Sequence, residues 1–214
     1  MGGELMFYWL IYNTTTGAIG THSSTHSPAI TTTTNGESTT SFDTSLLNGM
    51  SLIGWYDDAS NPMNPDEQAA YNTPQAYLYQ NGAFVSNSAW PAQQLVQAKQ
   101  TQSAALESAM NTTLGGGFTS KSTGHTYKTD AKGQADFIEA LKFFELSPST
   151  TSVKFLTLDA GWTDHTSQQL QQAFVDGGLW KQAQYTQLTS LVAKVETATT
   201  VADVQAITWT EATY

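Results

Sequence analysis

The sequence contains neither cysteine nor arginine among its 214 residues. Without cysteine, the chain has no disulfide, no thiolate nucleophile and no thiolate ligand for zinc. All eight basic residues are lysines, and they face eighteen acids, which gives a net charge of −10 at neutral pH. Proteins that bind nucleic acids or anionic membrane surfaces need a basic surface. We therefore expect no nucleic-acid partner and no attraction to such a membrane.

Charged residues of either sign are also scarce, at 12% of the chain, where about twice that share is usual. The apolar run over residues 6–12 is too short to cross a bilayer, and no basic residue precedes it. Its aromatic and β-branched residues predict a strand, so we expect neither a signal peptide nor a membrane anchor. Six Trp, nine Tyr and nine Phe supply large areas for burial, which is typical of a folded chain.

Short apolar runs and polar turns dominate the chain before residue 90. Asn-Gly dipeptides at residues 35–36 and 81–82 separate runs that are typical of strands, and each predicts a hairpin. Residues 50–58 form another apolar run. Residues 60–74 hold three of the six prolines and predict an extended connection. We therefore predict a small β-rich module over residues 1–89, suited to docking onto a partner.

Helical patterns dominate after residue 90. Pro91 suits the first position of a helix, and good helix formers follow it to about residue 110. Residues 133–146 have apolar side chains at helical spacing, and residues 153–166 predict two short strands around a turn. The fold class predicted for the whole chain is α+β, with a helix-rich α+β domain over residues 90–214.

The clearest helical pattern begins at Thr166, which makes a capping box with Gln169. The residues that step along one face by three and four are Leu170, Phe174, Gly177, Lys181, Gln184, Leu188, Leu191 and Val195. This spacing predicts one long amphipathic helix of about eight turns. The Gly177-Gly178 pair permits a kink or the close approach of a neighbouring segment.

Two polar stretches, residues 120–137 and 158–170, raise the question of catalysis. Their His125, His165, Asp130, Asp164 and Ser167 are residue types of acid–base or triad sites. No hydrolase, metalloprotease or phosphate-binding motif accompanies them, and we expect neither an enzyme nor a cofactor.

Helix capping is the alternative reading of these polar stretches. Asp130, Thr166 and Thr200 each stand just before a predicted helix, where a side-chain oxygen accepts backbone N–H groups and contributes about 1 kcal/mol. This role accounts for such residues at turns without any reaction chemistry.

Metal binding has equally little support in the sequence. His22 and His26 are four residues apart, but their segment reads as strand or loop, where this spacing does not place both on one face. We expect no metal site.

Aromatic residues in the β-rich module offer a binding surface. The candidates for an interface or a sugar-binding surface are Trp9, Trp55, Tyr56, Tyr77 and Tyr79. The alternative is that these rings form the core of a small module with few aliphatic residues.

Residues 91–209 resemble an uncharacterised C-terminal domain of bacteriophage tail proteins. The matching features are Tyr127-x-Thr129-Asp130 with Gln134 at one helix start, His165-Thr166 at the next, and a closing pattern that ends at Trp209. The N-terminal part resembles, more loosely, modules of tail-fibre and baseplate-associated proteins. Its matches are Tyr12, Thr16, Gly17 and Ile19, and then Tyr79, Asn81 and Gly82.

The resemblance implies a structural tail component, in the baseplate or a fibre, that acts through contacts with other tail proteins. It implies several copies or a homo-oligomer, synthesis in the host cytoplasm and a place in the virion. It brings no catalytic residue. Two alternatives remain open: a tail-fibre assembly chaperone, and a receptor-binding tip that recognises a glycan on the host surface.

Overall fold

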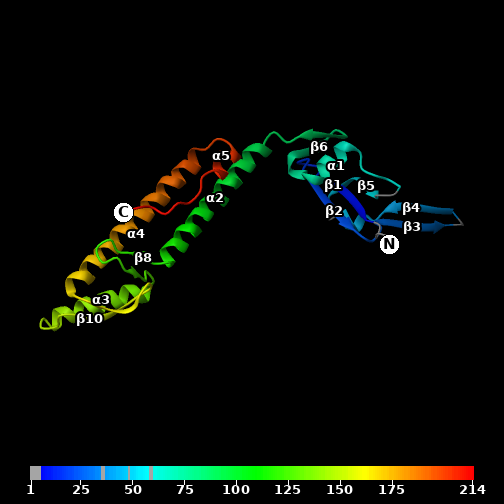
Figure 1. Ribbon diagram of the computed structural model, residues 1–214. Helices are drawn as coiled ribbons and strands as arrows, with labels where there is room; N and C mark the ends of the chain where they lie inside the picture. The colour runs from blue at the N-terminus through cyan, green and yellow to red at the C-terminus, as the bar shows by residue number, and fades with distance from the viewer. Residues whose placement is uncertain (1–5, 35–36, 48, 58–59) are drawn as a thin grey trace. The chain divides into compact units, whose positions relative to one another are not determined.

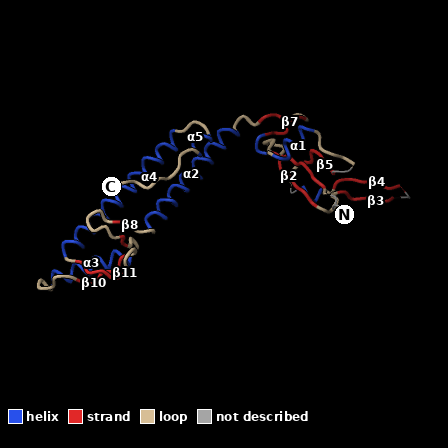
Figure 2. Tube along the Cα trace, in the orientation of Figure 1, coloured by secondary structure: helices blue, strands red, loops and turns tan. Residues whose placement is uncertain are grey.

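The computed structural model describes residues 6–34, 37–47, 49–57 and 60–214. The chain has an α+β fold and divides into two compact units, Met1–Gln93 and Gln94–Tyr214 (Figure 1). We call them the N-terminal and the C-terminal unit. Strands prevail in the first and helices in the second (Figure 2). The predicted Asn35-Gly36 turn and residues 1–5 lie outside the described residues.

A three-stranded antiparallel sheet forms the centre of the N-terminal unit. Its strands, in spatial order, are β2 (Ile19–Ser24), β1 (Phe7–Tyr12) and β5 (Ser51–Asp57). The apolar run predicted as a strand is the central one, and Trp9, Leu10 and Ile11 are buried. The register to β5 shifts between Leu10 and Ile11, where Ile53 of β5 is the extra residue. Trp9 and Ile11 belong to the core cluster of this unit, in keeping with the alternation of side chains along β1.

Two further hairpins belong to this unit. They are β3 (Ala29–Thr34) with β4 (Glu37–Phe42), and β6 (Tyr77–Gln80) with β7 (Ala83–Ser86). Between β6 and β7, Asn81 and Gly82 have φ angles of 52° and 81°, the positive pair that a type I′ turn requires. The second predicted hairpin is therefore confirmed. Short 3₁₀ turns span Thr44–Leu47 and Pro74–Ala76.

The extended connection predicted over residues 60–74 is wrong, because this segment contains helix α1 (Pro65–Asn72). The Asn64 side chain accepts hydrogen bonds from the backbone N–H groups of Asp66 and Glu67, and the Glu67 carboxylate accepts the N–H of Asn64 at 2.7 Å. This is a complete capping box, and Pro65 occupies the first helical position, which tolerates proline. The prolines of this segment favour an extended chain in the sequence pattern, but Pro65 starts a helix.

The C-terminal unit combines helices with two small antiparallel hairpins. The helices are α2 (Trp90–Gly115), α3 (Ala131–Leu146), α4 (Ser167–Thr197) and α5 (Val201–Gln205). The hairpins are β8 (Phe118–Thr119) with β9 (Thr126–Tyr127), and β10 (Val153–Thr157) with β11 (Gly161–His165). Within the described part of the chain, no helix has the length and apolar character of a membrane span.

Three of the helices begin with the side-chain caps expected from the sequence. Asp130 accepts the N–H of Gly133 at 2.6 Å, and Thr200 accepts the N–H of Asp203 at 3.1 Å. Thr166 accepts the N–H of Gln169, whose side-chain oxygen in turn accepts the N–H of Thr166 at 2.9 Å. These bonds satisfy N–H groups that a helix leaves without intrahelical partners.

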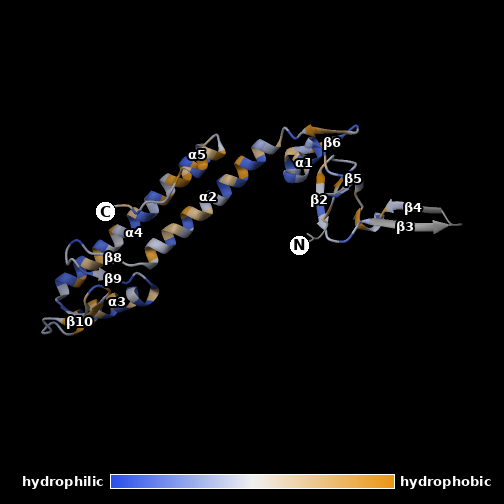
Figure 3. Cartoon of the chain, turned by 45° about the vertical axis from the view of Figure 1, so that its right-hand side comes forward, coloured by the Kyte–Doolittle hydropathy of each residue, from blue (hydrophilic) through white to orange (hydrophobic). Residues whose placement is uncertain are grey.

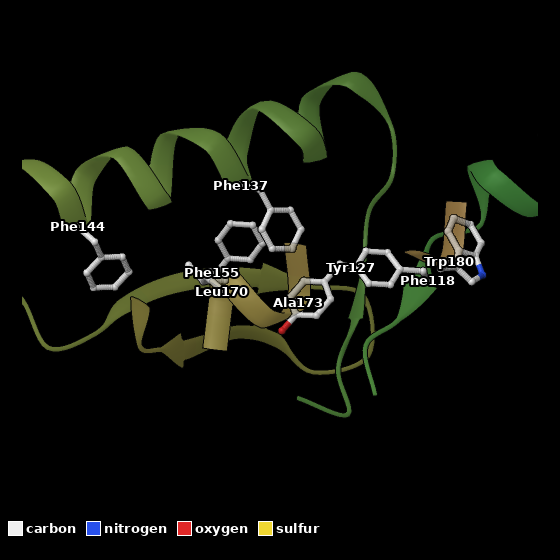
Figure 4. Packing of buried hydrophobic residues seen from close by; sticks show 8 residues of the cluster. All are labelled: Phe118, Tyr127, Phe137, Phe144, Phe155, Leu170, Ala173 and Trp180. Atoms are coloured by element: carbon white, nitrogen blue, oxygen red, sulfur yellow. The ribbon is translucent and has the colours of Figure 1, made fainter. Parts of the chain in front are cut away.

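Two cores hold the C-terminal unit together. An aromatic core lies between α3, α4 and the two hairpins (Figure 4). Its buried members are Phe118, Tyr127, Phe137, Phe144, Phe155, Leu170, Ala173 and Trp180. A smaller core joins α2, α4 and α5 through Leu106, Leu191, Val195 and Val204. The long helix α4 spans both cores, which explains its amphipathic pattern.

The buried face of α4 differs from the predicted one in its first half. Leu170, Leu191 and Val195 are buried as expected, but Phe174 is 46% exposed. Ala173 and Trp180 are buried in its place, because Phe118 packs directly against Gly177. A Cβ at residue 177 would lie 2.7 Å from the Phe118 ring, so the glycine pair serves close approach, and α4 continues through it.

Two leucines on α4 provide a test of this packing. Leu170 is fully buried, whereas Leu179 is 57% exposed. We expect Leu170→Ala to lower the free energy of unfolding by about 2–5 kcal/mol, and Leu179→Ala by about 0.5 kcal/mol or less. Chemical denaturation of both variants measures the difference. Equal losses would show that α4 does not bury the face described here.

Candidate functional site

The two polar stretches meet in the C-terminal unit, around a hydrogen bond between Tyr127 and His165. The Tyr127 hydroxyl lies 2.7 Å from Nε2 of His165, and both side chains are almost wholly buried. Tyr127 comes from β9 and His165 ends β11, so the bond joins the two hairpins. The hydroxyl of Thr123 lies 2.9 Å from the Tyr127 oxygen and completes a short chain.

The partners of His165 fix the direction of these hydrogen bonds. Its Nδ1 lies 3.2 Å from the carbonyl of Thr163, which can only accept, so Nδ1 carries the proton. Nε2 then accepts from the Tyr127 hydroxyl, whose oxygen accepts from Thr123. Burial lowers the pKa of His165 and raises the pKa of Tyr127, which keeps both side chains neutral. The network is therefore uncharged, and each ring has its polar groups satisfied.

A hydrogen bond between two side chains at the surface holds the same hairpins together. His125 Nδ1 lies 2.9 Å from the Asp159 carboxylate, which also accepts the backbone N–H of Thr126 at 2.7 Å. The hydrogen bond from His125, followed by that from Thr126, lowers the pKa of Asp159 to about 2. The N–H of Leu158 donates to the Thr126 carbonyl. The turn between β10 and β11 is thereby attached to β9.

A third polar contact fastens the β8–β9 turn to α4. The Ser120 hydroxyl, fully buried, donates to the Asp176 carboxylate at 2.6 Å, and the N–H of Ser122 donates to the same oxygen at 2.9 Å. Burial raises the pKa of Asp176, but the hydrogen bonds from Ser120 and Ser122 outweigh it, so the pKa is lowered overall. Ser120 is thus committed to a carboxylate and does not face a histidine.

The structure brings together some of the residues considered for catalysis and separates the others. The rings of His125 and His165 lie 5.5 Å apart. Asp164 instead pairs with Lys154 at 2.8 Å, Asp130 caps α3, and Ser167 is the first residue of α4. The arrangement orients two hairpins and a helix through neutral and paired groups. In the part of the chain that the structure describes, no three His, Cys, Asp or Glu residues cluster as metal ligands.

Some aromatic candidates of the N-terminal unit are core residues. Trp9 is only 6% exposed and belongs to the core, so the assignment of this ring to a binding surface is corrected. Tyr56 is equally buried, but it lines a polar groove of the same unit. Trp9 stacks on His22 at 5.5 Å, because the two residues are paired across β1 and β2. Trp55 is partly buried against the same core, and Tyr77 and Tyr79 are half-buried in β6.

A polar groove of about 350 Å³ lies beside Tyr56 in the N-terminal unit. Tyr8 and Tyr71 line it, with their ring centres 5.4 Å apart and almost perpendicular, together with Asp57 and Gln68. The sequence analysis missed Tyr8 and Tyr71. Tyr71 was assigned to an extended connection, and only the helix α1 brings it back to β1.

Among the described residues, large apolar side chains remain exposed mainly in the C-terminal unit. Hydrophobic and hydrophilic residues alternate along the helices of this unit (Figure 3). We define the α3 surface by Ile138, Phe143 and Leu146 of α3 with Trp162 of β11, which are 61%, 48%, 76% and 66% exposed. Phe143 lines two grooves, one along α3 beside Ile138 and Leu146, and one towards Trp162. The surface is therefore continuous from α3 to the β10–β11 hairpin, and it was not anticipated from the sequence.

Ion pairs border the α3 surface. Lys132 pairs with Asp136 at 2.7 Å, Lys142 with Glu145 at 2.6 Å, and Lys154 with Asp164 at 2.8 Å. Exposed pairs of this kind add little stability. Their effect here is local charge balance, in a chain whose net charge is −10.

The buried histidine makes stability depend on pH in a defined direction. Because the folded pKa of His165 is lowered, the unfolded chain takes up a proton as the pH falls through about 6.5 while the folded chain does not. Stability is therefore present above that pH and lost below it. The lowered pKa of Asp159 acts only in more acidic solution, below its unfolded value.

We expect denaturant unfolding at pH 7.5 and 5.5 to show less loss of stability on acidification in His165→Gln than in the wild type. Glutamine keeps hydrogen-bonding capacity but does not titrate. His26→Gln, at an exposed histidine, is the matched control and should keep the wild-type pH dependence. An unchanged pH dependence in His165→Gln would show that His165 is accessible to protons in the folded chain.

Comparison with known proteins identifies one family. Residues 97–208 match the model of a domain of unknown function, DUF4376. No curated protein and no solved structure matches the chain. The matched segment covers α3, α4, α5, both C-terminal hairpins and most of α2, which includes the polar network and the α3 surface. It spans more than half of the chain, and the protein therefore belongs to the DUF4376 family.

Proposed function

We propose that this protein is a structural component of a bacteriophage tail, in the baseplate or a tail fibre, and acts through protein–protein contacts. The observation that carries the proposal is the α3 surface. It exposes Ile138, Phe143, Leu146 and Trp162 on one continuous part of the C-terminal unit. Contiguous exposed apolar side chains mark sites where another protein packs.

The identity of the proposed assembly is inferred from the resemblance of the sequence to tail proteins. The resemblance to tail proteins rests on Tyr127, Thr129 and Asp130 at the start of α3 and on His165-Thr166 at the start of α4. These residues make the polar network and the caps that hold the α3 surface in place. The resemblance therefore concerns the part of the chain that carries the proposed contact.

Local charge balance also supports a packing role. Each lysine at the border of the α3 surface already has a carboxylate partner on the same surface. When a partner covers this surface, each ion of these pairs keeps its counter-charge beside it. Burial of an ion without its counter-charge would be costly. Tail assemblies are symmetric, so the covering partner is another tail protein or a further copy of this chain.

Mass spectrometry of purified phage particles tests the proposal. We expect a fixed copy number that follows the rotational symmetry of the tail. We expect the double variant Leu146→Ser/Trp162→Ser to be depleted from particles, because it removes the two most exposed side chains of the α3 surface. Val96→Ser, at a 56% exposed residue of α2, is the matched control and should be incorporated normally.

Denaturant unfolding of both variants establishes that they fold. Absence of the wild-type chain from particles, with the chain bound to a fibre in the lysate, would favour the assembly chaperone instead. Normal incorporation of the double variant would show that the α3 surface does not make the contact with other tail proteins.

The polar groove beside Tyr56 supports a second candidate function, the recognition of a glycan on the host surface. Aromatic faces with amide and carboxylate groups nearby suit sugar rings, and Tyr8, Tyr71, Gln68 and Asp57 supply them. We expect Tyr71→Ala to weaken binding of the purified chain to host envelope by about tenfold. Tyr185→Ala, at an exposed tyrosine of α4, is the control. Undiminished binding by Tyr71→Ala would exclude this groove.

A further inference from the structure

A separate cavity of about 150 Å³ opens between the start of α3 and the middle of α4. Its walls are the rings of Phe118, Phe137 and Phe174. Phe118 and Phe137 are buried members of the aromatic core, while Phe174 is 46% exposed and forms an edge towards solvent. Apolar cavities of this size bind a benzene ring. The cavity is distinct from the α3 surface, because none of the residues that define that surface lines it.

Two glycines leave this space open. Gly177 lies against the Phe118 ring, where a Cβ would meet it at 2.7 Å. At Gly178 a Cβ would meet no atom within 4 Å. Both residues line the cavity, so the glycine pair on α4 positions one wall and leaves the space beside it empty.

Two lysines, Lys128 and Lys181, also line the cavity. Both are half-buried, and neither pairs with a carboxylate among the described residues. Lys132, Lys142 and Lys154 differ, because each is more exposed and each has an acidic partner. None of the lining residues is acidic, and the Lys181 ammonium also lies 6.0 Å from the centroid of the Tyr185 ring. The two lysines therefore bring positive charge to an apolar space, in a chain with only eight basic residues.

The other polar groups around the cavity are already occupied. The Gln134 amide donates to the backbone carbonyl of Thr129 at 2.8 Å, and the Thr129 hydroxyl donates to the carbonyl of Leu114. The two lysines are thus the groups that remain for a ligand. A ligand that fits has an apolar ring for the cavity and negative charge beside it for Lys128 and Lys181.

We propose that this cavity binds an aromatic side chain of a partner protein that is flanked by acidic residues. A protein segment satisfies both requirements, because residues two apart in an extended chain point to the same face and so place carboxylates on either side of a ring. The proposal rests on the proposed function for the identity of the partner, another tail protein. It adds the chemistry of the segment that this partner inserts.

The test uses the full chain and a synthetic peptide, acetyl-Glu-Ala-Phe-Ala-Glu-amide, with 4-fluorophenylalanine at the centre. Fluorine NMR reports directly on the environment of the ring. We expect the fluorine signal to shift and broaden on titration. The matching Lys-Ala-Phe-Ala-Lys peptide should bind about tenfold more weakly, because its charges repel the two lysines.

Three variants locate the binding. Gly178→Leu places a side chain in the open space and should abolish binding of the acidic peptide. Lys128→Gln/Lys181→Gln should weaken it about tenfold and remove its salt dependence. Lys132→Gln is the matched control, since this lysine lies on the same unit outside the cavity lining, and it should bind like the wild type. Unfolding midpoints measured for all three establish that they fold.

Several results would overturn the inference. Equal binding of the acidic and basic peptides, or full binding by Gly178→Leu, would show that the cavity does not select this segment. Phenylacetate bound as tightly as the peptide would identify a small aromatic acid as the occupant in place of a protein segment. Incorporation into particles is measured separately. If the chain is present in particles but does not bind the peptide, only the inference about the cavity fails. If the chain binds the peptide but is absent from particles, the cavity is a binding site and the proposed tail role fails.

Discussion

The C-terminal unit depends on Tyr127, because its ring needs apolar neighbours and its hydroxyl needs hydrogen-bond partners. The ring belongs to the aromatic core, with Phe118, Phe137 and Phe155 around it at centroid distances of 5.1–6.0 Å. The hydroxyl is buried with the ring and needs partners, because an unsatisfied buried polar group costs about 1–3 kcal/mol. His165 and Thr123 supply them. A single residue thus fixes β9 against the core and against the end of β11.

The remaining polar contacts follow from this arrangement. Once β9 and β11 are joined, the turns beside them meet, and His125 reaches Asp159. Ser120 is likewise placed where its hydroxyl reaches Asp176 on α4. The residues that first suggest a catalytic site therefore form the connections between hairpins and helices. The lowered pKa of His165 keeps its ring neutral, and the Ser120 hydroxyl donates to a carboxylate, so both side chains are held by hydrogen bonds within the network.

Local signals in the sequence were sufficient for turns and helix starts. Asp130, Thr166 and Thr200 are recognisable as caps, and Asn81-Gly82 as a hairpin turn, because these structures depend on a few adjacent residues. The start of α1 had an equally local signal, Asn64 with Glu67, which was overlooked because the neighbouring prolines suggested an extended segment.

Features that depend on contacts between distant residues could not be predicted. Phe174 fits the periodic pattern of α4 as well as Leu170 does, yet only Leu170 is buried, because Phe118 occupies the space against Gly177. The same holds for the binding features. The cavity brings Phe118 together with Phe174, and the α3 surface joins Phe143 to Trp162, although each pair is far apart in the sequence.

The distribution of lysine connects these observations to function. Seven of the eight lysines of this acidic chain follow residue 120. Because they could have been spread over the whole sequence, their positions in the C-terminal unit are informative about its contacts. Beside the α3 surface, lysines are exposed and paired, and Glu139, which lines both grooves, is a carboxylate outside these pairs. Beside the cavity, Lys128 and Lys181 are half-buried and lack acidic partners.

Neutral apolar areas attract partners with little dependence on charge, whereas two unpaired ammonium groups distinguish an acidic partner from a basic one. The C-terminal unit thus has an exposed apolar surface and a separate cavity with lysines in its lining, and α3 contributes residues to both. The proposed tail role would use both features, because a component of a symmetric assembly has to bind strongly enough to be retained and selectively enough to reach one position.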